Sequence, residues 1–145
     1  MRATGETPKG GLPVQFVVAN VRDVMEAAPG VSVPEGVKHL VLSGVVDSGA
    51  TRLVLPQLAV EELRLPGHGE TTVRYADGRR EQRPVVSLVW LQLLGRDGVF
   101  SAVVEPGRQD ALIGAIVLEE LDLVVDCTTQ TLRPREPDSI LTEIE

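Results

Sequence analysis

The residues best suited to chemistry are Asp47, Ser48 and Gly49. They stand between two largely apolar runs, residues 40–46 and 53–55, and such runs predict buried strands. A carboxylate among buried strands is costly unless another group pairs with it or uses it. Gly49 allows a tight turn, and the Ser48 hydroxyl can form hydrogen bonds across a narrow gap. We therefore interpret Asp47 as a catalytic carboxylate held at the end of a strand.

The segments that must position this carboxylate are short apolar runs separated by turn residues. The core depends on valine and leucine because only 3% of the residues are aromatic, and valine favours sheet. The 14 glycines and 10 prolines indicate many turns. These patterns predict strands at residues 12–21, 37–46, 51–55, 84–94, 99–104 and 123–127, a short last strand at 132–133, helices at 56–62 and 115–121, a helical turn within 20–28, and a turn at 95–98.

One polar segment in the middle of the chain differs from these apolar runs. Residues 70–75 and 79–83 flank Ala76, Asp77 and Gly78, and an Asp-Gly turn between two strands is typical of a β-hairpin. Because its arms carry few apolar residues, we expect this hairpin to project from the core. An ordinary exposed hairpin fits the same pattern.

Length, charge and composition narrow the class of protein. A chain of 145 residues indicates one domain, which we place at residues 12–134, with flexible tails at residues 1–11 and 135–145. The net charge is −7 and the basic residues are scattered, which argues against nucleic-acid binding. The sequence shows no signal peptide and no long apolar span, so we expect a soluble cytoplasmic protein that does not associate with membranes.

The metal-binding residue types are sparse. Cys127 is the single cysteine, which excludes an intrachain disulfide and a cysteine-based zinc site. It is expected to pack as a small hydrophobic residue. His39 and His68 are too isolated for a metal site, so we expect neither a metal ion nor another cofactor.

Four features, in this order, resemble the retropepsin-like aspartic proteases, the clan that holds the retroviral proteases and their cellular and bacterial relatives. Val-Val-Asp-Ser-Gly-Ala at residues 45–50 is similar to the catalytic loop, and the hairpin at residues 70–83 is similar to the flap that closes over substrate. Ala-Leu-Ile-Gly at residues 111–114 resembles the second family signature, and the helix at residues 116–121 follows it as in the family. The resemblance covers roughly residues 12–134. The catalytic motif alone would be a weak signal, but the ordered set is specific.

The resemblance implies a fold and an activity. The fold is mostly β, a small closed barrel with one or two short helices and one lobe per chain. The activity is that of an aspartic endopeptidase that hydrolyses peptide or protein substrates as a homodimer. Hydrolysis by this route uses two carboxylates around one water. The chain is too short for the two-lobed form and contains one such motif, so the second Asp47 is expected from a second copy.

The resemblance also implies a role for each site residue. The two Asp47 carboxylates share a proton and titrate as a pair, Ser48 bonds across the dimer axis, and the Gly49 backbone lies near the carboxylates. The implied set is the catalytic Asp47, the active-site loop residues Ser48, Gly49, Ala50 and Thr51, the flap residues Tyr75, Ala76, Asp77 and Gly78, and the signature residues Leu112, Ile113 and Gly114.

The sequence departs from the retroviral members at three points. Those members carry an aspartate after the alanine and an arginine after the second glycine, and these two residues form an ion pair. Here the positions hold Thr51 and Ala115. Because both partners are replaced together, no lone buried charge remains. The flap tip has one glycine, Gly78, instead of the glycine-rich tip of retroviral flaps.

Other interpretations stay open at the level of sequence. The chain could be a non-catalytic dimerisation or peptide-binding module that retains the fold, because a fold alone does not establish activity. Retention of the aspartate, serine and glycine together argues against such a loss. The chain could instead be an unrelated small barrel that binds a ligand through Asp47, or Asp47 could be an ordinary turn residue.

Overall fold

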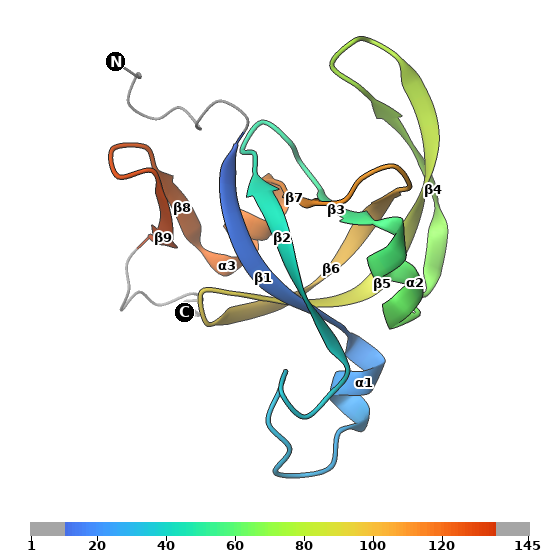
Figure 1. Ribbon diagram of the computed structural model, residues 1–145, viewed down its shortest axis with the longest axis vertical. Helices are drawn as coiled ribbons and strands as arrows, with labels where there is room; N and C mark the ends of the chain where they lie inside the picture. Colours follow the sequence, from blue (N-terminus) through green and yellow to red (C-terminus); the bar gives the residue numbers. More distant parts are fainter. Residues whose placement is uncertain (1–10, 136–145) are drawn as a thin grey trace, which may run out of the picture.

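Strands make up most of residues 11–135, the part of the chain that the computed structural model describes (Figure 1). Alternation of apolar and polar residues buries one face, as in β1 (Leu12–Asn20), where Phe16 and Val18 are buried and Gln15 is exposed. The other strands are β2 (His39–Val46), β3 (Leu53–Pro56), β4 (Gly67–Arg74), β5 (Arg80–Leu93), β6 (Arg96–Glu105), β7 (Ala111–Ile113), β8 (Leu123–Asp126) and β9 (Thr131–Pro134).

The main sheet closes into a barrel. Its strand order is β1-β2-β7-β3-β6-β5-β4, and β1 also pairs with β5. This closing pair is antiparallel and joins residues 17–20 to residues 89–92. β4 lies outside the closed part and pairs with β5 alone, as the outer arm of a hairpin. The predicted mostly β, closed barrel is therefore confirmed.

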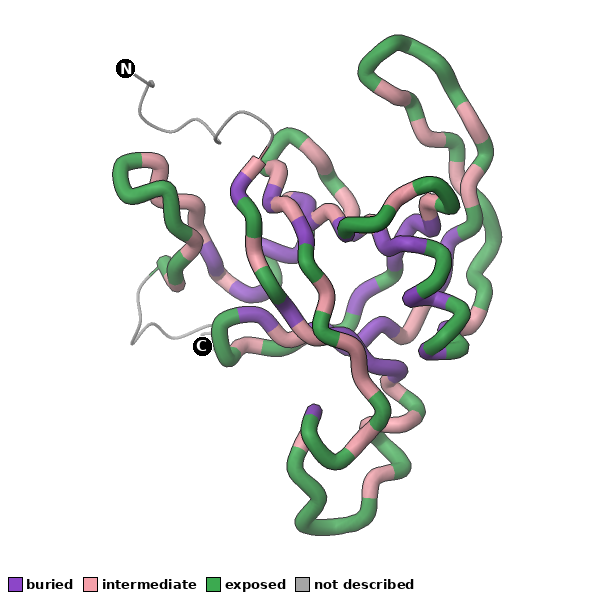
Figure 2. Tube along the Cα trace, viewed as in Figure 1, coloured by how far each residue is buried: buried purple, intermediate pink, exposed green. Residues whose placement is uncertain are grey.

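The interior of the barrel holds the apolar core. Val18, Val46, Leu55, Leu91 and Ile113 are all fully buried there, and Figure 2 shows the buried segments converging inside the barrel. Burial of an aliphatic side chain of this size contributes about 1.5–3 kcal/mol relative to exposure. Val46 and Ile113 belong to the two sequence motifs, so the core anchors both motifs.

β5 bends where Ser87 and Leu88 oppose one residue of β6. The register shifts between Val86 and Val89, and Leu88 has a φ of 59°. A bulge of this kind bends a strand and increases its twist. It allows one 14-residue strand to form both a wall of the barrel and an arm of the projecting hairpin.

The turn between β5 and β6 lies at Leu94 and Gly95, so the predicted turn at residues 95–98 is wrong in position. Both residues have positive φ, 54° and 77°, as a two-residue type I′ turn requires. Asp97 instead belongs to β6, where its Oδ2 accepts a hydrogen bond of 3.2 Å from the Trp90 indole. Leucine is not a typical turn residue, whereas Asp-Gly is, and the cross-strand pairing decided the position.

The described residues contain three short helices: α1 (Val21–Glu26), α2 (Gln57–Leu63) and α3 (Ala115–Leu121). The bounds predicted for α3 are confirmed. α2 begins one residue after Pro56, which is its N-cap instead of its first helical residue. α1 is the helical turn expected within residues 20–28, and it brings the number to three where the resemblance implied one or two.

β8 and β9 form a separate two-stranded sheet beside the barrel. Arg96 donates from Nη1 to the carbonyls of Leu121 (2.9 Å) and Asp122 (3.2 Å), which ties the start of this hairpin to β6. The elements run from Leu12 to Pro134, and residues 1–10 and 136–145 of the expected tails lie outside the described residues. None of the helices that the structure describes is long and apolar enough to span a membrane.

Candidate active site

Asp47 directly follows β2 and begins a tight loop that leads to β3. The Asp47 amide donates to the Ile113 carbonyl at 3.0 Å, and the Ala50 amide donates to the Asp47 carbonyl at 3.0 Å. The Gly49 amide donates to Asp47 Oδ1 at 2.9 Å. The carboxylate is therefore partly buried and held by its own loop, with the turn fixed through backbone groups.

The second signature holds this loop from the other side. β7 runs parallel to β2, pairing residues 111–113 with residues 44–46. Beyond it, the Ala115 amide donates to the Ala50 carbonyl at 2.8 Å, and the Ile116 amide donates to the Thr51 carbonyl at 3.0 Å. The first amides of α3 would otherwise lack partners, because a helix cannot satisfy its own first four N–H groups. The two motifs thus form one hydrogen-bonded unit.

Gly114 permits this contact because the loop passes where its side chain would be. A Cβ at this position would lie 2.6 Å from the Thr51 carbonyl carbon and from the Arg52 oxygen. The backbone of Gly114 is extended, with φ −93° and ψ −177°, which any residue can adopt. Close approach of the backbone, not an unusual conformation, therefore requires glycine here.

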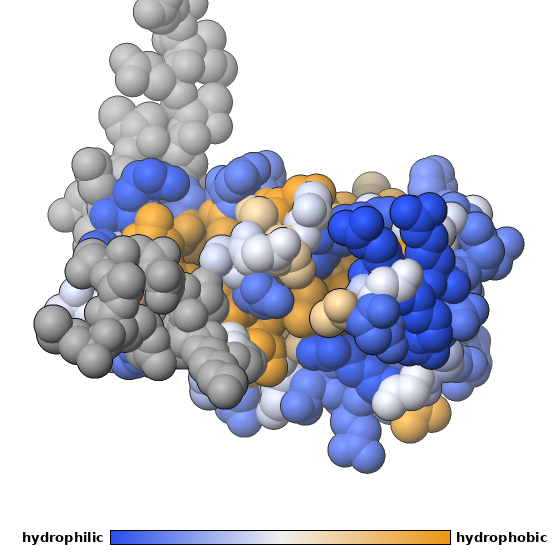
Figure 3. Space-filling model, turned by 90° about the horizontal axis from the view of Figure 1, so that it is seen from above, coloured by the Kyte–Doolittle hydropathy of each residue, from blue (hydrophilic) through white to orange (hydrophobic). Residues whose placement is uncertain are grey.

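The hairpin of β4 and β5 projects from the barrel at the end that also carries the Asp47 loop (Figure 1). Its turn is closed by bonds from the Tyr75 amide to the Arg79 carbonyl and from the Gly78 amide to the Tyr75 carbonyl, both 2.9 Å. Asp77 Oδ1 accepts from the Arg79 amide, and Gly78 takes a φ of 88°. Viewed onto this end, hydrophilic side chains gather over the hairpin beside an apolar band (Figure 3). We call residues 70–83 the flap.

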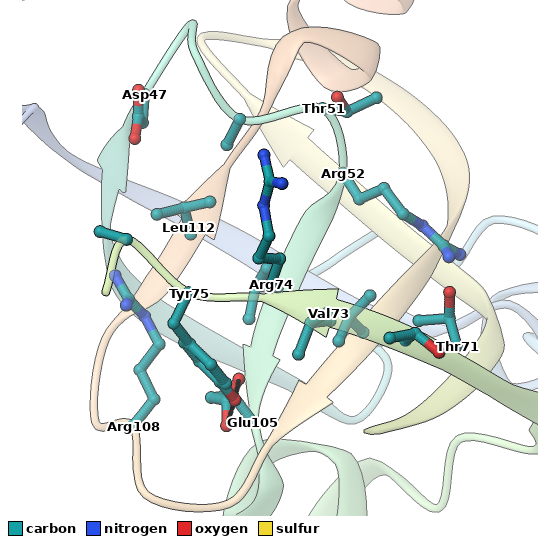
Figure 4. A pocket seen from close by; sticks show the side chains of 15 residues that line it. Asp47, Thr51, Arg52, Thr71, Val73, Arg74, Tyr75, Glu105, Arg108 and Leu112 are labelled. Atoms are coloured by element: carbon teal, nitrogen blue, oxygen red, sulfur yellow. Dashed lines mark hydrogen bonds between the residues drawn. The ribbon is translucent and has the colours of Figure 1, made fainter. Parts of the chain in front are cut away.

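A cleft of about 620 Å³ lies between the flap and the Asp47 loop (Figure 4). Its apolar surface includes Val54, Val103 and Leu112, while Thr71 and Thr72 line it from the flap. The remaining lining residues are Asp47, Ala50, Thr51, Arg52, Val73, Arg74, Tyr75, Ala76, Glu105 and Arg108. Segments far apart in the sequence therefore meet around one cleft, and Asp47 is part of its lining.

Tyr75, Arg83 and Glu105 form a cluster that fixes the flap to β6. The Tyr75 hydroxyl lies 2.9 and 2.8 Å from the two Glu105 carboxylate oxygens. Arg83 Nε donates to Glu105 Oε1 at 2.8 Å and to the Tyr75 hydroxyl at 3.0 Å. The Arg79 guanidinium covers the Tyr75 ring, 4.4 Å from its centroid. Partial burial is the main cause that raises the pKa of Tyr75, and the hydrogen bond to Glu105 raises it further. The hydrogen bond to Glu105 also raises the pKa of Arg83.

The sequence aligns with the aspartyl protease family model over residues 32–125, which is more than half of the chain. The chain belongs to the aspartyl protease family. Members of the retropepsin-like group act on peptide substrates, as the sequence motifs indicated. No curated protein matches the chain.

The site residues expected of an aspartyl protease fall into three groups. Those that line the cleft are Asp47, Ala50, Thr51, Tyr75, Ala76 and Leu112. Ile113 and Gly114 are buried behind the loop and support it. Ser48 and Gly49 are exposed at the turn, and Asp77 and Gly78 are exposed at the flap tip.

Sequence reasoning missed the contribution of Glu105, Arg83 and the arginines of the cleft to this aspartyl protease. Glu105 lies 30 residues from Tyr75 and 22 from Arg83, so no local pattern connects them.

Among the described residues, no three His, Cys, Asp or Glu side chains gather as metal ligands would. His39 Nδ1 lies 2.8 Å from the Val37 carbonyl.

Proposed function

We propose that the chain is an aspartic endopeptidase that hydrolyses peptide bonds as a homodimer, with water activated between two Asp47 carboxylates, one from each subunit. The observation that carries this proposal is the position of Asp47. It directly follows β2 at the buried Val46, its loop is bonded to the segment around Gly114, and it lines a cleft beneath the flap. Membership of the aspartyl protease family supports the same chemistry.

The need for a second copy follows from the carboxylates of the cleft. Glu105 is the other carboxylate in its lining, and it is paired with Arg83 at 2.8 Å while contacting the Tyr75 hydroxyl. Figure 4 places Glu105 and Asp47 at opposite ends of the cleft. An acid that must hold and donate a proton is poorly served by a fixed cation at 2.8 Å. A second Asp47 across a two-fold axis supplies the missing partner.

The surface beside the loop suits such an axis. Ile116, whose amide bonds to the loop, has a side chain that is 46% exposed, although it is large and apolar. Ser48 is exposed at the turn next to Asp47. A second copy placed here would cover Ile116, bring the two Ser48 hydroxyls together and join the two Asp47 loops. Strand pairing along the β8–β9 sheet would add to this interface.

The reaction then proceeds in two steps, and each step includes two proton transfers. The ionised carboxylate takes a proton from the water as the water oxygen attacks the carbonyl carbon, and the protonated partner donates to the carbonyl oxygen. The resulting tetrahedral diol collapses when one of its hydroxyls gives a proton to the carboxylate that is now ionised, the protonated carboxylate donates to the nitrogen, and the carbon–nitrogen bond breaks. The pair recovers one shared proton, because two adjacent carboxylates do not both ionise easily. Closure of the flap would exclude bulk water during these steps.

The decisive experiment compares Asp47→Asn with Asp110→Asn on an unbiased peptide library at acidic to neutral pH. The Asp110 side chain is exposed and outside the cleft lining, and the variant keeps the backbone carbonyl that accepts from Arg108, so it removes a carboxylate and leaves the site intact. We expect cleavage to be lost in the first variant and kept in the second. Sedimentation should show that Asp47→Asn still forms dimers, since the substitution removes like-charge repulsion at the axis.

The outcomes separate the competing functions. Cleavage by purified Asp47→Asn at a rate comparable to the unmodified chain would remove Asp47 from the mechanism. Peptide binding without cleavage by either protein would favour a non-catalytic peptide-binding module. A dimer whose Asp47 side chains lie far apart would favour a ligand-binding barrel.

A further inference from the structure

Three arginines in the cleft have no carboxylate partner among the described residues. Arg52 donates to the Ser101 hydroxyl at 3.1 Å, and Arg108 donates to a backbone carbonyl at 2.6 Å. The Arg74 backbone pairs with Arg80 in the β4–β5 ladder, and its side chain forms no hydrogen bond or ion pair with the described part of the chain. Of the eight described arginines outside the cleft, three also lack such a partner, Arg22, Arg64 and Arg80, whereas five lie within 4.0 Å of a carboxylate: Arg79, Arg83, Arg96, Arg133 and Arg135.

This arrangement gives the cleft a positive excess in a chain whose net charge is −7. Of its two carboxylates, Glu105 is neutralised by Arg83, which lies outside the lining. Asp47 belongs to the proposed dyad, which carries about one negative charge for each dimer. Each dimer therefore places six guanidinium groups of the cleft against about one uncompensated negative charge.

The positions of these arginines suit a bound peptide. Figure 4 shows Arg52 and Arg108 on opposite sides of the cleft, and Arg74 extending from the flap toward the loop that carries Asp47 and Thr51. Arg74 is exposed on β4, so flap closure would bring it against whatever occupies the cleft. A guanidinium presents donors in a fork that matches a carboxylate, and such charge-assisted bonds are among the strongest in proteins.

We infer that this cleft selects peptides that carry aspartate or glutamate side chains close to the scissile bond. The inference rests on the proposed function. Without the arginines, the negative dyad would repel an acidic substrate. With them, each acidic side chain gains a fixed cation, and a neutral peptide leaves the arginines without a partner.

The test compares peptides that differ only in charge. A cleaved peptide from the library is made with glutamate flanking the scissile bond and again with glutamine at the same places, which keeps shape and polarity. We expect kcat/KM for the glutamate peptide to be higher by about tenfold, the factor that one charge-assisted bond of modest strength gives. The preference should vanish below about pH 4, where glutamate is protonated, and shrink in about 1 M salt.

Single substitutions assign the preference to the cleft. Arg74→Gln should reduce the ratio between the two peptides by several-fold, because its side chain has no structural partner to lose. Arg22→Gln is the matched control, since Arg22 is also exposed and unpaired among the described residues but lies on α1, outside the cleft. Arg22→Gln should leave the ratio unchanged. Melting temperatures of both variants should match that of the unmodified chain.

The outcomes distinguish failure of this inference from failure of the proposed function. If cleavage depends on Asp47 but kcat/KM is the same for the glutamate and glutamine peptides, the acidic preference is overturned and the proposed function stands. A second result would also overturn the acidic preference. If Arg52→Gln or Arg108→Gln dimerises more weakly, and the ratio of kcat/KM for the two peptides is unchanged in these variants and in Arg74→Gln, then the arginines contact the partner subunit instead of the substrate. If no peptide is cleaved, fluorescence anisotropy with Asp47→Asn decides: tighter binding of the glutamate peptide supports the recognition, and equal binding refutes it.

Discussion

Replacement of Gly114 by alanine tests whether close packing of the two motifs holds the active-site loop. The added Cβ would lie 2.6 Å from backbone atoms of Thr51 and Arg52, whereas ordinary carbon contacts begin near 3.5 Å. The loop or α3 must therefore move by roughly 1 Å. Backbone atoms cannot rotate away as a side chain would, so the cost should reach the upper end of the overpacking range, about 3 kcal/mol.

Two measurements follow from this displacement. For a chain of this size, about 3 kcal/mol lowers the melting temperature by roughly 6–12 °C. A shift of about 1 Å in Asp47 should lower kcat by about a hundredfold, since such misplacements disrupt the reacting geometry. Thermal unfolding and steady-state cleavage of one peptide measure the two effects.

Other glycines provide matched controls for the Gly114→Ala variant. Gly107 has no atom near its Cβ position and no positive φ, so Gly107→Ala should be almost neutral. Gly78 also has open space but a φ of 88°, so Gly78→Ala should cost only about 1 kcal/mol through backbone strain. A Gly114→Ala protein that melts within a degree or two of Gly107→Ala would refute the close-packing argument.

Three further predictions concern assembly, the flap and acidity. Specific activity should fall on dilution as the proposed dimer dissociates, and activity that persists where sedimentation detects only monomer would contradict a shared site. Tyr75→Phe removes the hydroxyl that contacts Glu105, so amide hydrogens of residues 71–82 should exchange faster; an unchanged rate would show that the cluster does not hold the flap. The hydrogen bond from the Thr129 amide is the main cause that lowers the pKa of Asp126, and the hydrogen bond from Arg133 lowers it further. Ionised Asp126 therefore stabilises this sheet fully above about pH 3.9, and the contribution is lost as pH falls through the lowered pKa. Amide hydrogen exchange in β8–β9 should accelerate in that pH range, and Asp126→Asn should abolish the acceleration.

The tight Asp47 loop and α3 could be predicted because their determinants are local. Asp47 is flanked by residues whose chemistry specifies a tight turn after a strand. The helix α3 follows a glycine, buries Val117, Leu118 and Leu121 on one face, and ends at Asp122 in the left-handed conformation. Such signals lie within one or two turns of chain, where sequence patterns are most informative.

The features that could not be predicted depend on residues distant in the sequence. Closure of the barrel joins β1 to β5, and no sequence pattern in either strand indicates that they pair with each other. The pairing of β5 with β6 moved the turn to Leu94 and drew Asp97 into a strand. Tyr75 and Glu105 meet only because the flap folds back over β6. In each case tertiary pairing overrides local preference.

The β1–β5 contact also determines the order in which the chain can fold. About seventy residues separate its two sides, so this pairing carries a large loop-closure cost and belongs to the contacts that make β proteins fold slowly. During synthesis at about 5–20 residues per second, the β1 edge of the β1–β2 hairpin stays unpaired for several seconds before β5 is synthesised. The nascent chain is therefore most exposed to aggregation before its second half is made. A fragment limited to residues 32–125 would lack β1 and leave the edges of β2 and β5 permanently unpaired.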